Sequence, residues 1–199
     1  MQANSSIVKT LTRRFFDRMP HIVAPELLGK CLVAHDGRMV RIVETEAYAQ
    51  DDPAAHTFRG ETARNRSMFG PPGHMYVYFS YGVHWCANVV CGPKGFGAGV
   101  LLRAAQPMAG IDLMEAARGN VAFKQLCNGP GKLAQAMGID RHADGTDVVG
   151  GGPFTVIDDA HAPVTVIACP RIGISKAVEA PLRFVIADNP FVSKRPMAR

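Results

Sequence analysis

The chain has 199 residues, of which 47% are hydrophobic and 20% are charged, and its formal net charge is +5 at pH 7. This is ordinary globular composition, sufficient for a substantial core, and it contains no repeat or low-complexity segment. No apolar run is long enough to cross a bilayer and the N-terminal residues form no signal core, so we expect neither a membrane partner nor secretion. Five cysteines without framework spacing favour reduced thiols and a cytoplasmic location.

The basic charge is modest support for a polyanionic partner. Arginines outnumber lysines about two to one, and arginine suits bidentate phosphate contacts better than lysine does. Arg59, Arg64 and Arg66 also lie close together in the sequence. This cluster is more informative than the overall charge, which many enzymes share.

The first third of the sequence predicts two short helices followed by a β-hairpin. In chain order we expect a short helix that Thr12 caps and Pro20 stops, a helix over Val23–Leu28, and strands over Cys31–Ala34 and Met39–Tyr48. Gly29 is typical of a residue that ends a helix, and Asp36-Gly37 is typical of a hairpin turn.

The returning strand of this hairpin combines an apolar half with a charged half. Its alternation puts on one face Val40, Ile42, Glu44, Glu46 and Tyr48. We expect the apolar half of this face to enter the core and the carboxylates to emerge at a sheet edge. A carboxylate beside an aromatic wall is the arrangement that a general base needs, although an edge strand with solvated glutamates fits the same pattern.

The remainder of the sequence predicts more strands than helices. We expect a helical turn over 53–56, a short helix or tight loop over 62–68, a hairpin of strands His74–Ser80 and His84–Cys91, a strand over Val100–Ala105, helices over Ile111–Arg118 and Gly129–Met137, and strands over Phe154–Asp158, Val164–Ala168 and Arg183–Ala187. No linker-like change in composition divides the chain. We therefore expect residues 1–199 to form a single α+β domain around one largely antiparallel sheet.

Glu46 and His56 are the first pair of residues that indicate chemistry. They lie on either side of a turn, so their side chains can face one pocket. A carboxylate base activates water, and a nearby histidine can hold a substrate or a phosphate oxygen. A lone histidine is more often surface or core filler, and the residues alone leave that alternative open.

The second predicted hairpin places two tyrosines around a tight turn at Gly82. Tyr78 occupies an even position and Tyr81 an odd one, and side chains at even and odd positions of a strand point to opposite faces. One tyrosine can therefore point into the body of the protein while the other stands at the tip. An exposed tyrosine at a hairpin tip near arginines resembles a wedge that enters a nucleic-acid groove and fills the space of a displaced base. The alternative is two tyrosines that pack on a sheet face.

Two cationic residues also stand out. Arg103 interrupts the apolar run VLLRAA, and a buried arginine needs a phosphate, a carboxylate or bound water as its partner. Lys132 lies in the first turn of the last predicted helix, where free backbone N–H groups favour an anion. By contrast, His84, Cys86 and Cys91 lack the spacing of a zinc site, so we expect no metal.

Nine stretches of the sequence, taken in order, resemble the alkyladenine (3-methyladenine) DNA glycosylase family. They are LLGKCLV (27–33), RIVETEAY (41–48), DDPAAH (51–56), RNRSMF (64–69), PGHMYVYFSYGVHWCANVV (72–90), VLLRAAQPMAG (100–110), NGPGKL (128–133), RIG (171–173) and PLRF (181–184). Together they cover most of the chain and are far more specific than any one of them. The resemblance implies a single mixed α/β domain with a curved antiparallel sheet and a protruding hairpin, no organic or redox cofactor, and double-stranded DNA as the partner.

The resemblance also implies roles for the residues at matching positions. Glu46 is the general base that activates water, and Arg103 lies beside that water and the target nucleotide. A base flipped out of the helix occupies a pocket formed by Tyr48, His56 and Tyr78, in which the two tyrosines stack on its two faces.

Other positions are assigned to selectivity and to DNA. Asn88 crowds the 2-amino group of normal guanines, and Tyr81 is the intercalating wedge. We assign the basic residues Arg64, Arg66 and Lys132 to DNA phosphates.

The expected reaction is hydrolysis of the N-glycosidic bond of damaged purines, from the group of 3-methyladenine, 7-methylguanine, hypoxanthine and etheno-adenine. We expect no strand cleavage, because no lysine lies in 41–60 to form a Schiff base. Two alternatives are a non-catalytic module that binds damaged DNA and a small-molecule hydrolase that uses Glu46 and His56.

The chain differs from mammalian members in lacking their N-terminal extension and in carrying Val83 and His84 on its hairpin. We expect a monomer, associated with the nucleoid if its source is a bacterium.

Overall fold

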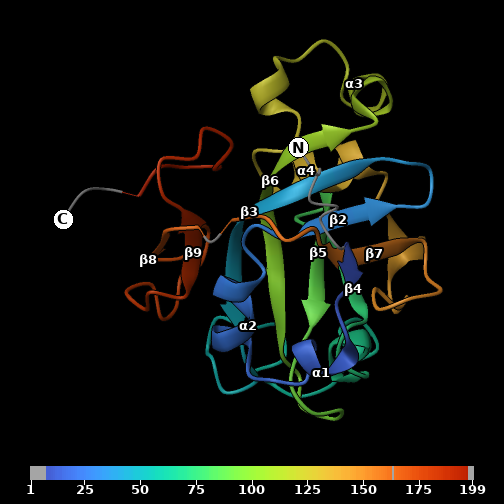
Figure 1. Cartoon of the computed structure of the whole chain (residues 1–199). Helices are drawn as coiled ribbons and strands as arrows, with labels where there is room; N and C mark the ends of the chain where they lie inside the picture. The colour runs from blue at the N-terminus through green and yellow to red at the C-terminus, as the bar shows by residue number, and fades with distance from the viewer. Residues whose placement is uncertain (1–7, 163, 197–199) are drawn as a thin grey trace.

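A curved antiparallel sheet forms the centre of the molecule (Figure 1). The computed structural model describes residues 8–162 and 164–196, and within them nine strands pair in the order β1-β7-β2-β3-β6-β5-β4, with β9 on β3 and β8 on β9. The strands are β1 (Lys9–Thr10), β2 (Cys31–Ala34), β3 (Met39–Tyr48), β4 (Met75–Ser80), β5 (His84–Val90), β6 (Gly99–Ala109), β7 (Phe154–Asp158), β8 (Val166–Cys169) and β9 (Arg183–Ile186). The predicted α+β class is confirmed. The expectation that the N-terminal residues form no signal core rests partly on residues 1–7, which lie outside the described residues.

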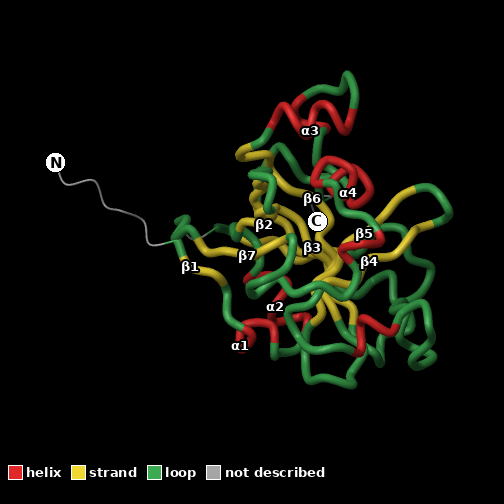
Figure 2. The backbone as a smooth tube through the Cα atoms, turned by 90° about the vertical axis from the view of Figure 1, so that its right-hand side faces the viewer, coloured by secondary structure: helices red, strands yellow, loops and turns green. Residues whose placement is uncertain are grey.

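The helices are short and lie around the sheet (Figure 2). In the described part of the chain they are α1 (Arg13–Phe16), α2 (Pro20–Glu26), α3 (Ile111–Arg118) and α4 (Pro130–Met137), with 3₁₀ turns η1 (Arg66–Phe69), η2 (Phe123–Gln125) and η3 (Arg141–Ala143). Pro20 begins α2 instead of merely ending the first helix, because the first helical position needs no N–H. As predicted, α4 ends at Met137, and the following Gly138 is left-handed with φ 68°. The segment 53–56, expected as a helical turn, forms non-helical turns.

Strand β3 is a central strand, and the prediction that its carboxylate end lies at a sheet edge was wrong. Strand β6 pairs with β3 along most of its length, while β2 and β9 share the opposite side. The partners of Glu44 and Glu46 on β9 are Val185 and Arg183. Both glutamates are therefore fully buried. Local pattern could not indicate this, because β9 comes from a distant part of the chain.

A β-bulge in β3 turns the two glutamates away from the main core. The register with β6 shifts on both sides of Glu44. Val40, Ile42 and Ala47 pack in the main hydrophobic core, whereas Glu46, the neighbour of Ala47, lines a pocket on the other side. One extra residue reverses which face the later side chains occupy. The prediction of one shared face along the whole strand was wrong for this reason.

The β4–β5 hairpin extends from the body of the protein (Figure 2). The side chains of β4 alternate between two faces: Met75 and Val77 join the main core, while Tyr76 and Tyr78 pack in a second cluster beside η1. The hairpin thus presents Tyr78 to the same side of the sheet as Glu46.

Candidate active site

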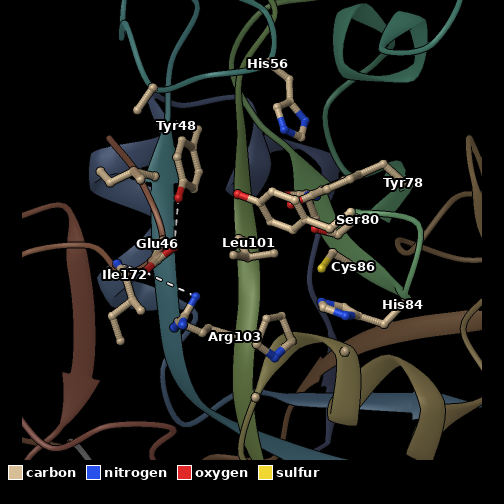
Figure 3. Close-up of a pocket in the computed structure, with 18 of the residues that line it drawn as sticks. Glu46, Tyr48, His56, Tyr78, Ser80, His84, Cys86, Leu101, Arg103 and Ile172 are labelled. Carbon is tan, nitrogen blue, oxygen red and sulfur yellow. Dashed lines mark hydrogen bonds and ion pairs between the residues drawn. The ribbon is translucent and has the colours of Figure 1, made fainter. Parts of the chain in front are cut away.

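A pocket of about 1110 Å³ opens between β3, the β4–β5 hairpin, β6, α4 and the segment 172–176. In Figure 3, Tyr48 and Tyr78 lie on opposite sides of it, with Glu46 and Arg103 toward one end and His56 toward the other. The predicted site residues that line it are Glu46, Tyr48, His56, Arg64, Tyr78, Tyr81, Asn88, Arg103 and Lys132. Arg66 lies outside this lining, exposed and paired with Glu61 at 3.2 Å.

Glu46 is fully buried, and each of its carboxylate oxygens accepts one hydrogen bond. The Tyr48 hydroxyl donates to Oε2 at 2.8 Å, and the backbone N–H of Ile172 donates to Oε1 at 2.9 Å. Nη1 of Arg103 lies 3.5 Å from the same Oε1. Since a carboxylate oxygen has two lone pairs, Oε2 keeps capacity for a further donor such as water.

Tyr48 presents one face to the pocket while its other face is covered. The guanidinium of Arg171 lies over the ring, 4.6 Å from the centroid, and is itself held by Asp52 and by the carbonyl of Ala47 at 2.9 Å. Burial, and then the charge of Glu46, raise the pKa of Tyr48 well above its ordinary value of 10.0. The phenol therefore stays protonated and keeps donating to Glu46.

His56, Tyr76 and Tyr78 form a connected aromatic group. The two tyrosine rings stack with centroids 5.4 Å apart, and the imidazole meets Tyr78 edge-on at 4.5 Å. His56 Nδ1 lies 3.1 Å from the Tyr76 hydroxyl. Burial, and secondly the charge of Arg64, lower the pKa of His56 below 6.5, while burial raises the pKa of Tyr76 to about 12. The pair is therefore uncharged at neutral pH.

Asn88 forms part of the pocket wall on β5. It is buried, and its side-chain amide donates to the carbonyl of Tyr76 at 3.2 Å across the hairpin. This bond holds the amide in one orientation, so a ligand meets a rigid polar group at this point of the wall.

The tip of the hairpin carries an exposed aromatic side chain. Tyr81 is 88% exposed, and its backbone is left-handed with φ 49°. A residue other than glycine at positive φ is strained, so the fold holds this tyrosine outward at an energetic cost. Behind the tip, the rings of Phe79 and Trp85 lie against each other across the two strands, with their centroids 4.8 Å apart.

Cationic side chains surround the pocket. Arg64 donates to the carbonyl of Phe79 at 3.1 Å, which ties it to the hairpin. The Lys132 amine donates to Asn128 Oδ1 at 2.9 Å at the start of α4, and Lys176 lines the pocket from the opposite segment. These charges give the pocket a positive border.

Sequence reasoning missed several residues that hold the site together. Glu44 forms ion pairs with Arg103 at 3.2 Å and with Arg183 at 2.9 Å. Arg171 and Ile172 support Tyr48 and Glu46 from one loop. Arg171, Ile172 and Arg183 lie in the stretches RIG and PLRF, which sequence reasoning used only as parts of a resemblance. The spacing of these stretches does not show which strand they contact.

Neither a metal-binding cluster nor a membrane-spanning helix is present in the described residues. Residues 8–162 and 164–196 contain no group of three or more His, Cys, Asp or Glu side chains placed to hold a metal ion. In the same ranges, none of the helices combines the length and apolarity that crossing a bilayer requires. The five cysteines are all buried free thiols.

Comparisons with known proteins place the chain in a family. The family model described as methylpurine-DNA glycosylase matches residues 14–190. A protein from Burkholderia lata named "Putative 3-methyladenine DNA glycosylase" is 54% identical over 187 residues, which cover 92% of this chain and 90% of the relative. Proteins with the same name are 50% identical over 184 residues in Rhodopseudomonas palustris, covering 92% and 88%, and 49% identical over 172 residues in Nitrosospira multiformis, covering 86% and 88%. The chain therefore belongs to the methylpurine-DNA glycosylase family of DNA N-glycosylases.

Proposed function

We propose that this protein flips damaged purine nucleotides out of double-stranded DNA and excises their bases by hydrolysis. The observation that carries the proposal is the carboxylate of Glu46, fully buried beside a pocket with aromatic walls and hydrogen bonded by Tyr48 and Ile172. A buried charge is costly even when it is paired and hydrogen bonded, and an ionisable group buried at the wall of a pocket is a typical feature of a functional site. Family membership supports base excision as its use.

The proposed reaction breaks the bond between C1′ of the sugar and a purine nitrogen, whose electron pair leaves with the base. Positive charge then builds on the sugar, and Glu46 stabilises it. Glu46 accepts a proton from the attacking water, whose oxygen forms the new bond to C1′. Arg103, 3.5 Å from Glu46, is proposed to hold this water and the target nucleotide.

The pocket supports recognition of a flipped purine by stacking. Tyr48 and Tyr78 are proposed to contact its two faces, and each stacked base gains about 1–3 kcal/mol. A cationic alkylated purine such as 3-methyladenine or 7-methylguanine gains more from the aromatic rings and leaves as a neutral base. Hypoxanthine and etheno-adenine are neutral, so they need a proton or a hydrogen bond, which we assign to the side of His56. Asn88 is proposed to exclude guanine by crowding its 2-amino group.

The exposed hairpin tip supports the flipping step. A base in a duplex must be turned out to reach Glu46, at a cost of a few kcal/mol that is lowest for a damaged base. Tyr81 is proposed to fill the vacated space, and Arg64, Arg66 and Lys132 are proposed to contact phosphates.

We also propose that the enzyme does not cleave the strand. The absence of lysine in 41–60 is insufficient support, because Lys132 and Lys176 reach the pocket from other segments. Stronger support is that the amine of Lys132 is engaged by Asn128, to which it donates at 2.9 Å. A covalent DNA adduct trapped with borohydride would contradict this part of the proposal.

The alternative of a non-catalytic module that binds damaged DNA uses the same wedge and cations. It gives no role to a carboxylate that is buried at the pocket and repels DNA. A small-molecule hydrolase, the other alternative, leaves the strained and exposed Tyr81 without a function. These observations favour the glycosylase.

Release of free base from two duplexes, one with hypoxanthine and one with 3-methyladenine, tests the proposal under single-turnover conditions. Release by the wild type supports it, and the ratio of the two rates describes substrate range. Binding without release from either duplex would favour the binding module. Affinity for DNA that does not fall steeply as salt rises would favour the small-molecule hydrolase.

We expect the protein to run as a monomer in gel filtration and to associate with the nucleoid in a bacterial cell.

A further inference from the structure

Glu44 does not line the pocket, yet it is fully buried and surrounded by donors. Its Oε1 accepts from the Ser193 hydroxyl at 2.9 Å and lies 3.2 Å from Nε of Arg103 and 2.9 Å from Nε of Arg183. Its Oε2 accepts from the backbone N–H of Ser193 at 2.5 Å. The arginine side chains are 12% and 4% exposed. Glu44 is thus the centre of a buried charge cluster behind the site.

Arg103 connects this cluster to the active site. Its Nε faces Glu44, while its Nη1 lies 3.5 Å from Glu46. A guanidinium is planar and rigid, so a partner that holds Nε also determines where the two Nη groups point. Without that partner, Arg103 is free to turn both Nη groups onto Glu46 and occupy the oxygens that the attacking water requires.

The C-terminal segment completes this arrangement. The Ser193 hydroxyl donates to Glu44 and accepts from Arg103 Nε at 3.2 Å, which uses its only donor and one of its two acceptor lone pairs. Arg183 donates to the carbonyl of Lys194, which ties the same segment to β9. The bulge in β3 turns Glu44 toward these partners, and bulges are frequent beside active sites.

We propose that Glu44 is a positioning residue of the excision reaction: together with Ser193 it holds Arg103 in the orientation that serves Glu46. This inference rests on the proposed function. The competing explanation is that Glu44 only fastens the C-terminal segment to the sheet and contributes stability.

Single-turnover excision by Glu44→Gln, alone and combined with Arg103→Gln, separates the two explanations. Because Glu44 acts through Arg103, Glu44→Gln should slow base release by about tenfold to a hundredfold, with unchanged affinity for the damaged duplex. In the Arg103→Gln background it should have little further effect, since coupled residues are non-additive. Ser193→Ala should give a smaller loss of the same kind, and Ser193→Thr, which keeps the hydroxyl, should restore the rate.

Several outcomes would overturn the inference. They are a wild-type rate for Glu44→Gln, losses that multiply in the double variant, and a loss that only follows the folded fraction measured by circular dichroism. If Glu44→Gln does not fold, the cycle of Ser193→Ala with Arg103→Gln decides, because Ser193→Ala removes one hydroxyl from a half-buried position. If the wild type releases no base from any duplex, the proposed function fails as well, whereas loss of the coupling alone refutes only this inference.

Discussion

Replacing Glu46 with glutamine tests the centre of the site, and the geometry indicates how the new amide would settle. Ile172 N–H can only donate, so the amide oxygen should stay on it. The Tyr48 hydroxyl can accept as well as donate, so the amide nitrogen should turn toward it. Both hydrogen bonds therefore survive, and the walls of the pocket keep their positions.

What Glu46→Gln removes is the negative charge and the capacity to take a proton from water. A positioned general base contributes about 10²- to 10⁴-fold, which corresponds to about 3–5 kcal/mol on the barrier to excision. The free energy of unfolding should change by less than about 2 kcal/mol, because Arg103 keeps Glu44 at 3.2 Å.

The assay is single-turnover release of hypoxanthine and 3-methyladenine at saturating protein, with affinity for each duplex measured in parallel. Glu115→Gln is the matched control, because it makes the same change of charge at an exposed position on α3. We expect Glu46→Gln to bind like the wild type and to lose excision, and the control to keep both. A rate within about tenfold of the wild type, below the range for a general base, would refute the assignment.

Three further predictions concern the hairpin tip, the aromatic pocket and the positive border. Tyr81→Ser should weaken binding to a damaged duplex by about tenfold or more, because it removes the free energy of stacking between the ring and a base. It should leave Tm unchanged, because the side chain is 88% exposed. Equal affinity of the variant and the wild type would contradict the role of Tyr81 as a wedge. His56 should titrate below 6.5 by NMR, and Arg64→Gln should raise its pKa only partly, because burial is the larger cause. The pKa of His56 is lower in the folded protein than in the unfolded chain, so neutral His56 contributes its full stability above about pH 6.5. This contribution is lost as pH falls through the folded pKa. A His56 pKa at or above 6.5 would contradict both points. Lys132→Gln should reduce the slope of log affinity against log salt by about 0.9, whereas Lys94→Gln, exposed and outside the pocket lining, should not; equal slopes would remove Lys132 from the interface.

Prediction from sequence succeeded where structure depends on neighbours in the chain. Helix α3 and strand β7 have the predicted bounds, and the second predicted hairpin is present as the antiparallel pair β4 and β5. The parity argument for the tip also agrees with the exposure of Tyr81. These features depend on a side-chain period of two or on turn residues, and both are properties of a short segment.

It failed for the residues whose meaning depends on distant partners. The carboxylate end of β3 was expected at a sheet edge. That prediction failed because no residue near β3 in the sequence shows that Arg183 on β9 is the partner of Glu46. The bulge at Glu44 was also invisible, since a bulge exists only relative to the strand opposite it.

The sequence by itself determined all the strands except β1, the hairpin and the chemical groups of the site, together with their resemblance to a glycosylase family. Only the tertiary structure decided that Glu46 is buried and hydrogen bonded by Ile172, and that Ser193 contacts Glu44 behind it. The physical reason is that local periodicity sets the direction of a side chain within its own strand. Burial and hydrogen-bond partners depend on which distant segments pack against that strand, and packing of the whole chain selects them.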